Sequence, residues 1–184
     1  MSNYRRWRVA GGVYFFTVVT YGRKPFLIEP TARACLREAL ESVRVRRPWE
    51  ILAWVTLPEH LHTVWRLPTG DVDYSTRWRQ VKTIFTRQFL ETQPVLPVNA
   101  MNRQRRNERN VWQRRYFEHT CRDEADVKRC VDYVHVNPLK HGLVQRVCDW
   151  PWSSFHRYVT LGEYDLNWGS EANWFGDEFR DAEL

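Results

Sequence analysis

The sequence has few cysteines, no long apolar run and no cleavable signal peptide. Its four cysteines are spread over 184 residues without a Cys-x-x-Cys pair, which argues against a zinc ribbon and fits a reduced cytoplasmic protein. The basic N-terminal residues are not followed by the apolar segment of a secretory signal, and no stretch is apolar enough to span a bilayer. We therefore expect neither secretion nor a membrane partner. The cysteines are Cys35, Cys121, Cys130 and Cys148.

Acidic residues are scarce in most of the chain and gather at its C-terminal end. Residues 161–184 hold seven acids and one arginine, a net charge of −6, so with an overall charge of +6 residues 1–160 carry +12. A basic body with a pI near 9.3 favours a polyanionic partner, nucleic acid before membrane. The alternative is that the arginines only keep the surface soluble.

The length of the chain fits one globular domain. At 22.3 kDa it is large enough for one well-formed hydrophobic core and too small for two of ordinary size. Ten tryptophans are many for this length, and flat rings beside arginines also offer stacking surfaces for unpaired bases. We expect one domain over residues 1–146. A C-terminal extension, residues 147–184, is acidic from about residue 161 and is not expected to be an independent domain.

Hydrophobic patterns predict alternating strands and helices in the first half of the chain. Residues 13–21 are β-branched or aromatic throughout, which indicates a central strand buried on both faces. Residues 30–47 open with proline and then repeat apolar residues at helical spacing. Strands over residues 50–57 and 60–67 are separated only by Pro58-Glu59, so they are expected to form a hairpin.

The second half of the chain continues this alternation. Residues 75–91 have helical periodicity with Ser75 as the N-cap, and residues 92–110 form a polar, arginine-rich loop. Residues 111–122 have the composition of a strand. Asp123 then caps a helix that we expect to end near Val136, because the residue before Pro138 is pushed out of the α region.

The order β-α-β-β-α-β followed by a further helix predicts an α+β fold. It is the order of the ferredoxin-like split βαβ arrangement, a four-stranded antiparallel sheet with two helices on one face. The first and third strands are the central pair of that topology. We expect the further, tyrosine-bearing helix to lie against the other face.

His60 and His62 stand out in the third predicted strand. Because side chains alternate along a strand, both imidazoles project to one face, while Leu61, Thr63 and Trp65 face the two helices. Two imidazoles on one face make half of a metal site. The same pattern also arises by chance or as a hydrogen-bonded pair.

The last predicted helix adds two residues that suit the same site. Tyr133 and Asn137 lie four residues apart and so share a helix face. A divalent cation held by two imidazoles and a carboxamide keeps positions open for phosphate oxygens, and a tyrosine oxygen can attack the phosphorus in line. Tyr116 is the nearest rival nucleophile because it follows two arginines, but it has no asparagine at helical spacing.

With these motifs in this order, the chain resembles the single-tyrosine HUH endonucleases and transposases, and among them the REP-associated tyrosine transposases. The resemblance rests on His60-Leu61-His62, on Tyr133-x-x-x-Asn137 and on three longer stretches, and it spans about residues 1–160. The loop over residues 92–110 is longer than this group usually needs, and the acidic end carries no matching motif. The stretches are WQRRYFEH at 112–119, YVHVNPLKHGLV at 133–144 and DWPWSSF at 149–155.

The resemblance implies a metal-dependent endonuclease and strand transferase acting on single-stranded DNA at repetitive extragenic palindromes (REPs). It implies that Tyr133 forms a 5′-phosphotyrosine intermediate and that His60, His62 and Asn137 hold Mg²⁺ or Mn²⁺. No other cofactor is expected. The expected partner is single-stranded or hairpin DNA, the expected location is the nucleoid in the cytoplasm, and a monomer is favoured over a homodimer.

Basic residues predict where the DNA would lie. The candidates form an N-terminal arm, a pair before the fourth strand and a lysine near the end of the last helix, with a solvated terminus or structural hydrogen bonding as the alternative. We also expect the loop arginines to contact the backbone of the hairpin. The candidates are Arg5, Arg6, Arg8, Arg114, Arg115 and Lys140, with Arg103, Arg105, Arg106 and Arg109 in the loop.

Two other functions fit part of the pattern. The first is a non-catalytic DNA- or RNA-binding module, because ferredoxin-like sheets with exposed aromatic residues also stack bases. Such a module would not need Tyr133 and Asn137 to face the histidines. The second is a metal phosphoesterase for small substrates, which would form no covalent link to DNA.

Overall fold

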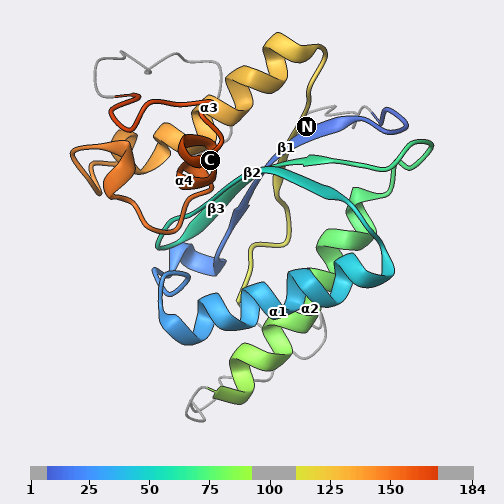
Figure 1. Ribbon diagram of the computed structural model, residues 1–184. Coiled ribbons are helices and arrows are strands. Elements are labelled where there is room, and N and C mark those ends of the chain that lie inside the picture. The colour runs from blue at the N-terminus through green and yellow to red at the C-terminus, as the bar shows by residue number, and fades with distance from the viewer. Residues whose placement is uncertain (1–7, 93–110, 170–184) are drawn as a thin grey trace, which may run out of the picture.

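The computed structural model describes residues 8–92 and 111–169, and its elements follow the predicted order (Figure 1). The strands are β1 (Val13–Val19), β2 (Glu50–Thr56), β3 (His60–Arg66) and β4 (Phe117–Thr120). The long helices are α1 (Pro30–Arg46), α2 (Tyr74–Thr92) and α3 (Glu124–Lys140). Shorter helical segments are η1 (Tyr21–Arg23), η3 (Val147–Asp149) and α4 (Phe155–Thr160).

The sheet is antiparallel with strand order β2-β3-β1-β4, so β1 and β3 are the central pair, as predicted. Nearly every residue of both central strands is buried. In the register between them, Val19 pairs with His60 and Thr17 with His62. The predicted ferredoxin-like α+β fold is confirmed.

Helices α1 and α2 lie on one side of the sheet, and α3 lies on the other (Figure 1). Alternate residues of β3 divide between the two sides: Leu61 and Trp65 join the core formed with α1 and α2, and Val64 joins the core formed with α3. The pleat of a strand sets this division. His60 and His62 therefore belong to the α3 side.

Helix α3 continues about one turn beyond its predicted end, so this prediction is wrong. Asn137 and Pro138 lie inside the helix, which ends at Lys140. Proline removes one helical hydrogen bond and disfavours the α conformation of the residue before it. However, both residues are buried, and their carbonyls accept hydrogen bonds from the backbone N–H groups of His141 and Leu143. Packing of this last turn outweighs the local preference.

The helix caps agree with the predictions in one case of two. The Asp123 cap of α3 is confirmed, since its carboxylate accepts a bond of 2.8 Å from the backbone N–H three residues later. Ser75 is not the cap of α2, because the helix begins at Tyr74 and the Asp73 carboxylate accepts the corresponding bond at 3.0 Å. Strand β4 begins at residue 117 rather than 111.

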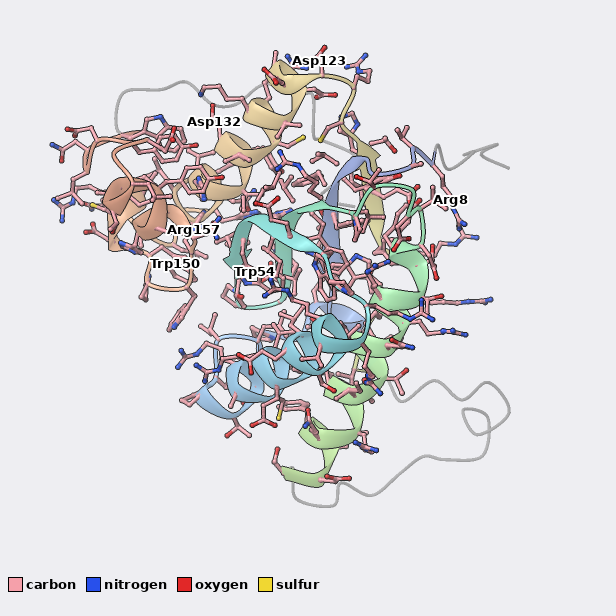
Figure 2. The ribbon with its side chains drawn as sticks, turned by 45° about the vertical axis from the view of Figure 1, so that its right-hand side comes forward. Arg8, Trp54, Asp123, Asp132, Trp150 and Arg157 are labelled. Carbon is pink, nitrogen blue, oxygen red and sulfur yellow. The ribbon has the colours of Figure 1, made fainter. Side chains whose placement is uncertain are left out.

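The segment after α3 covers the outer edge of β2. Ser153 forms a β-bridge with Val55, and the backbone N–H of Thr56 donates to the Trp152 carbonyl at 2.9 Å. The Trp150 indole (labelled in Figure 2) packs into the core between the sheet and α3 and donates to the Thr56 carbonyl at 3.0 Å. Open sheet edges invite pairing with other chains, and this segment removes that exposure.

Among the described residues, no helix is both long and apolar enough to cross a membrane. The division of the chain at residue 146 stays a prediction.

Candidate active site

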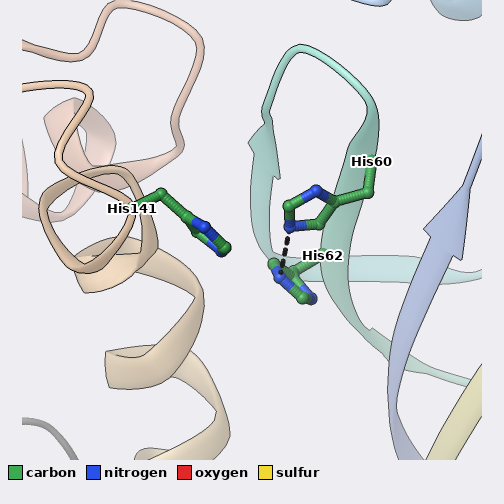
Figure 3. Close-up of side chains that lie close together, drawn as sticks. All are labelled: His60, His62 and His141. Carbon is green, nitrogen blue, oxygen red and sulfur yellow. Dashed lines mark hydrogen bonds between the residues drawn. The ribbon is translucent and has the colours of Figure 1, made fainter. Parts of the chain in front are cut away.

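The two histidines of β3 meet beneath α3 (Figure 3). His60 is 2% exposed and His62 is fully buried, and their Nε2 atoms lie 3.1 Å apart. The rings meet edge to face at 82°. At this separation two ring nitrogens either share a proton or direct their lone pairs toward a common third atom.

Neighbouring side chains hold the other nitrogen of each ring. His62 Nδ1 lies 2.8 Å from the Thr17 hydroxyl oxygen, and His60 Nδ1 lies 3.0 Å from the Glu59 carboxylate. The hydrogen bond with His60 lowers the pKa of Glu59, so the carboxylate is a charged acceptor. A neutral ring that donates from Nδ1 keeps its lone pair on Nε2, which is the tautomer that binds a metal through Nε2.

The protonation of His62 also suits a metal ligand. Burial holds its pKa well below the ordinary value, and the neighbouring His60, His141 and Lys140 act in the same direction. His62 is therefore neutral near pH 7, as a ligating imidazole must be. Two ligand atoms in adjacent positions about 2.1 Å from a cation are roughly 3.0 Å apart. The observed separation of 3.1 Å between the Nε2 atoms matches this value.

Helix α3 brings a tyrosine, an asparagine and a third histidine to the pair. Tyr133, Asn137 and the C-cap residue His141 follow one another at intervals of four residues, so they lie along one face. The Tyr133 ring is centred 5.4 Å from the His62 ring, and the His141 ring 5.1 Å from the His60 ring. The three histidines each offer a ring nitrogen within 4.8 Å of the others, and Figure 3 shows His141 directed at the pair.

The Asn137 amide is fully buried beside His62. Neither its oxygen nor its nitrogen makes a well-aligned hydrogen bond within the described part of the chain, although its contact with His62 raises the pKa of that ring. A buried carboxamide without good partners costs stability. A cation between the amide oxygen and the imidazole nitrogens would satisfy the oxygen of this group, so the residues present fit a divalent metal.

The candidate nucleophile is buried under a lysine. Tyr133 is 4% exposed, and the edge of its ring packs against Phe15 of β1, with centroids 5.7 Å apart. The Lys140 ammonium lies 3.4 Å from the phenolic oxygen and 4.9 Å from the ring centre. A positive charge at this distance stabilises a phenolate relative to a phenol.

Comparison with known proteins identifies the family. The family model described as "Transposase IS200 like" matches residues 9–137. The REP-associated tyrosine transposase of Escherichia coli (strain K12) is 42% identical over 175 residues, 95% of each chain. The chain belongs to the IS200-like transposase family. A relative from Haemophilus influenzae, named for the same REP-associated group, is 41% identical over 174 residues, 94% of this chain and 96% of that protein.

A solved structure supports the same relationship. The structure of a REP-associated tyrosine transposase bound to a REP hairpin matches this transposase with a TM-score of 0.79 and 41% identity, covering 96% of this chain and 94% of the other. The resemblance read from the motifs is confirmed. The chain is thus an enzyme of a transposase family whose members are DNA nucleases.

The structure does not bring the described part of the N-terminal arm to the histidines. Arg5 and Arg6 lie outside the described residues, as do all the loop arginines of the prediction. Arg8 lies over the Tyr74 ring, 5.6 Å from its centre, at the start of α2 (Figure 2). This is the opposite end of β1 from the histidine pair, roughly 20 Å along the strand.

The other predicted DNA contacts lie closer to the site. Arg114 and Arg115 are exposed just before β4. The backbone N–H of Gln113 donates to the Val19 carbonyl, and Val19 pairs with His60 in the sheet. The two arginines therefore lie at the histidine end of the sheet. Lys140, the last predicted contact, lies on the candidate nucleophile itself.

His141 is the site residue that sequence reasoning missed. Its four-residue spacing from Asn137 is a usable signal, but a helix that stops at Val136 leaves His141 in a loop with no defined direction. Tyr116, the rival nucleophile, lies on the α1/α2 side, where its ring packs against Phe16 at 5.9 Å. It is therefore separated from the histidines by the sheet.

Proposed function

We propose that this transposase cuts and rejoins single-stranded DNA beside REP hairpins, with Tyr133 as the nucleophile. One observation carries the proposal: the face of α3 that bears Tyr133 and Asn137 meets His60 and His62. A module that only stacks bases has no need of such a set. The related structure with a REP hairpin bound supports the choice of substrate.

In the proposed step the phenolic oxygen of Tyr133 attacks the phosphorus of a DNA diester in line with the 3′-oxygen. The bond from phosphorus to tyrosine forms as the bond to the 3′-oxygen breaks, the phenolic proton passes to water, and the departing oxygen gains a proton to become a 3′-hydroxyl. The 5′-phosphate stays on the enzyme. Attack by another 3′-hydroxyl reverses the step and joins strands without external energy, because one diester replaces another.

We assign the metal site of this reaction to His60, His62 and Asn137, with His141 as a further nitrogen ligand. Mg²⁺ or Mn²⁺ bound there supplies Lewis-acid polarisation of the phosphate. Thr17 and Glu59 hold the outer nitrogens of the two buried imidazoles and so fix their orientation. Nitrogen ligands suit Mn²⁺ better than Mg²⁺, which prefers oxygen.

Because Tyr133 is buried, a DNA phosphate can reach its phenolic oxygen only if the side chain that covers it moves. Lys140 covers the phenol, so the proposal requires this side chain to turn from the ring to the incoming phosphate. The exposed Arg114 and Arg115 at the same end of the sheet would hold the strand beside the site. The contacts assigned to the N-terminal arm stay predictions.

One chain supplies every residue of the proposed site, so we propose that a monomer cuts DNA, within the nucleoid. Light scattering on the complex with a hairpin should give one protein per DNA. A complex of two proteins with one hairpin would contradict the monomer.

The decisive test of the reaction is a covalent adduct. An end-labelled oligonucleotide with a REP hairpin and single-stranded flanks is incubated with protein and Mn²⁺ and run on a denaturing gel. We expect a protease-sensitive adduct that is absent in Tyr133→Phe. Tyr21→Phe, which changes an exposed tyrosine, is the matched control and should keep the adduct. Hairpin binding without any adduct, over several metals and repeat sequences, would favour the non-catalytic binding module.

A further inference from the structure

A second group of metal-ligating side chains lies between β4 and α3. His119 belongs to β4, Cys121 follows that strand, and Cys130 lies on α3. One ligand atom from each lies within 4.8 Å of the others. Cys130 is fully buried, whereas His119 and Cys121 are half-buried, so a cation can enter from solvent. None of the three belongs to the proposed nuclease site.

The separation of the two sulfur atoms suits a shared cation. Cys121 Sγ and Cys130 Sγ lie 3.6 Å apart, and both thiols are free. Two sulfurs about 2.3 Å from a tetrahedral Zn²⁺ are roughly 3.8 Å apart. The backbone already fixes this approach, since the Cys121 N–H donates to the Val13 carbonyl at 2.9 Å in continuation of the pairing between β1 and β4.

A buried carboxylate orients the histidine. Asp126 is 2% exposed and accepts a bond of 3.0 Å from His119 Nε2. In the neutral ring this leaves the lone pair on Nδ1, and a carboxylate behind a ligating imidazole is the usual support of a zinc site. Asp126 also accepts bonds from Arg122 and Arg129. Both oxygens of Asp126 are therefore occupied by hydrogen bonds, so Asp126 orients His119 rather than binding the cation itself.

We propose that His119, Cys121 and Cys130 bind Zn²⁺ or a similar thiophilic divalent cation, with water in the fourth position. Two thiolates and an imidazole prefer such an ion over Mg²⁺. The bound ion ties the edge strand β4 to α3 less than one turn before Tyr133. It thereby holds the N-terminal half of the helix that carries the proposed nucleophile against the sheet, a role separate from the cleavage reaction.

Cobalt distinguishes this site from the histidine site. Metal-free, reduced protein is titrated with Co²⁺, and the near-ultraviolet charge-transfer band of a cobalt–thiolate bond is recorded. We expect the band in the wild type, its loss in Cys121→Ser and Cys130→Ser, and its retention in Cys148→Ser. Cobalt held by His60, His62 and Asn137 gives no such band. A wild-type protein that binds Co²⁺ without the band would overturn the proposal.

A measurement on the wild-type chain guards against variants that fail to fold. Alkylation of each cysteine is followed by mass spectrometry with and without Zn²⁺. We expect zinc to slow alkylation of Cys121 at least tenfold and to leave the half-buried Cys148 unchanged. Equal protection of both cysteines, or of neither, would refute the site. A Cys121–Cys130 disulfide that forms equally fast with and without zinc would refute it in favour of a redox pair.

Discussion

Strand β3 presents Leu61 and Trp65 to helices α1 and α2, and His60 and His62 to helix α3. On the first side the core is aromatic and apolar, with Trp65 stacked on Trp78 at 4.2 Å. On the second side two imidazoles, an amide and a phenol are buried together. The same strand thus contributes to a stabilising core with one set of residues and to the proposed active site with the other.

The difference has an energetic reason. Buried apolar surface stabilises the fold, whereas buried polar groups cost stability unless each is fully hydrogen-bonded or bound to a ligand. Apolar burial on the face covered by α1 and α2 can offset the free-energy cost of burying polar groups on the opposite face of the sheet. Changes on the first face should therefore reduce stability, and changes on the second should reduce activity first.

The largest expected effect is on the apolar face. Trp65→Ala removes a fully buried indole that packs on Trp49 and Trp78, and we expect a loss of about 3–5 kcal/mol in the free energy of unfolding. Val45→Ala, at a position 86% exposed, is the control and should change it by less than about 0.5 kcal/mol. Urea denaturation measures both. Equal losses would contradict the assignment of stability to this face.

On the polar face we expect a large effect on activity and a small effect on stability. Asn137→Ala should slow adduct formation about 100-fold at limiting Mn²⁺, with recovery as Mn²⁺ is raised. Its free energy of unfolding without metal should change by less than about 1 kcal/mol, because the amide makes no well-aligned hydrogen bond among the described residues. Cleavage rates over a Mn²⁺ titration, with Asn167→Ala as the control, measure this. Unchanged Mn²⁺ dependence would exclude Asn137 as a ligand.

His135, a buried histidine outside the proposed active site, should make the free energy of unfolding depend on pH. Burial lowers the pKa of His135 to about 3, from 6.5 in an unfolded chain, and its Nε2 lies 2.8 Å from the Ser154 hydroxyl oxygen. Between these values the unfolded chain binds a proton that the folded chain does not. Stability should therefore fall as pH falls from about 6.5 toward 3, by up to about 1.4 kcal/mol per pH unit.

Urea denaturation from pH 4 to pH 7 measures this slope. His135→Asn should make the dependence shallower, because the variant lacks the group that titrates. The buried His62, whose pKa is also lowered, contributes with the same sign and accounts for part of the slope that remains. A variant with the full slope of the wild type would show that His135 is accessible to protons in the folded state.

The smallest expected effect concerns Lys140, the lysine over the proposed nucleophile. Lys140→Gln removes the ammonium that is proposed to turn from the phenolic oxygen to the incoming phosphate, and should slow cleavage about tenfold at low salt. The deficit should shrink as salt is raised, because salt screens the attraction between the ammonium and the phosphate. Lys128→Gln on the same helix, where the lysine pairs with Asp132, is the matched control. A deficit that does not vary with salt would contradict a contact between Lys140 and the phosphate.

The sequence was sufficient to predict the fold and to place His60 and His62 on one face of the sheet. Period-two alternation placed His60 and His62 on a common face, and the order of elements placed β1 and β3 at the centre of the sheet. Local rules failed where tertiary packing decides. Because proline disfavours the α conformation of the residue before it, the predicted helix ended before Asn137, and His141 was not recognised as part of its face. The sequence spacing of Cys121 and Cys130 gave no sign that their sulfur atoms lie close together.

The central claim is that Tyr133 becomes linked to DNA, and mapping the adduct tests it most directly. Trypsin cuts after Arg129 and Lys140 to release residues 130–140, in which Tyr133 is the only tyrosine. Tandem mass spectrometry of the nuclease-trimmed adduct should find the nucleotide on Tyr133 of this peptide. A nucleotide on a peptide that contains any other tyrosine, with peptide 130–140 unmodified, would contradict the account.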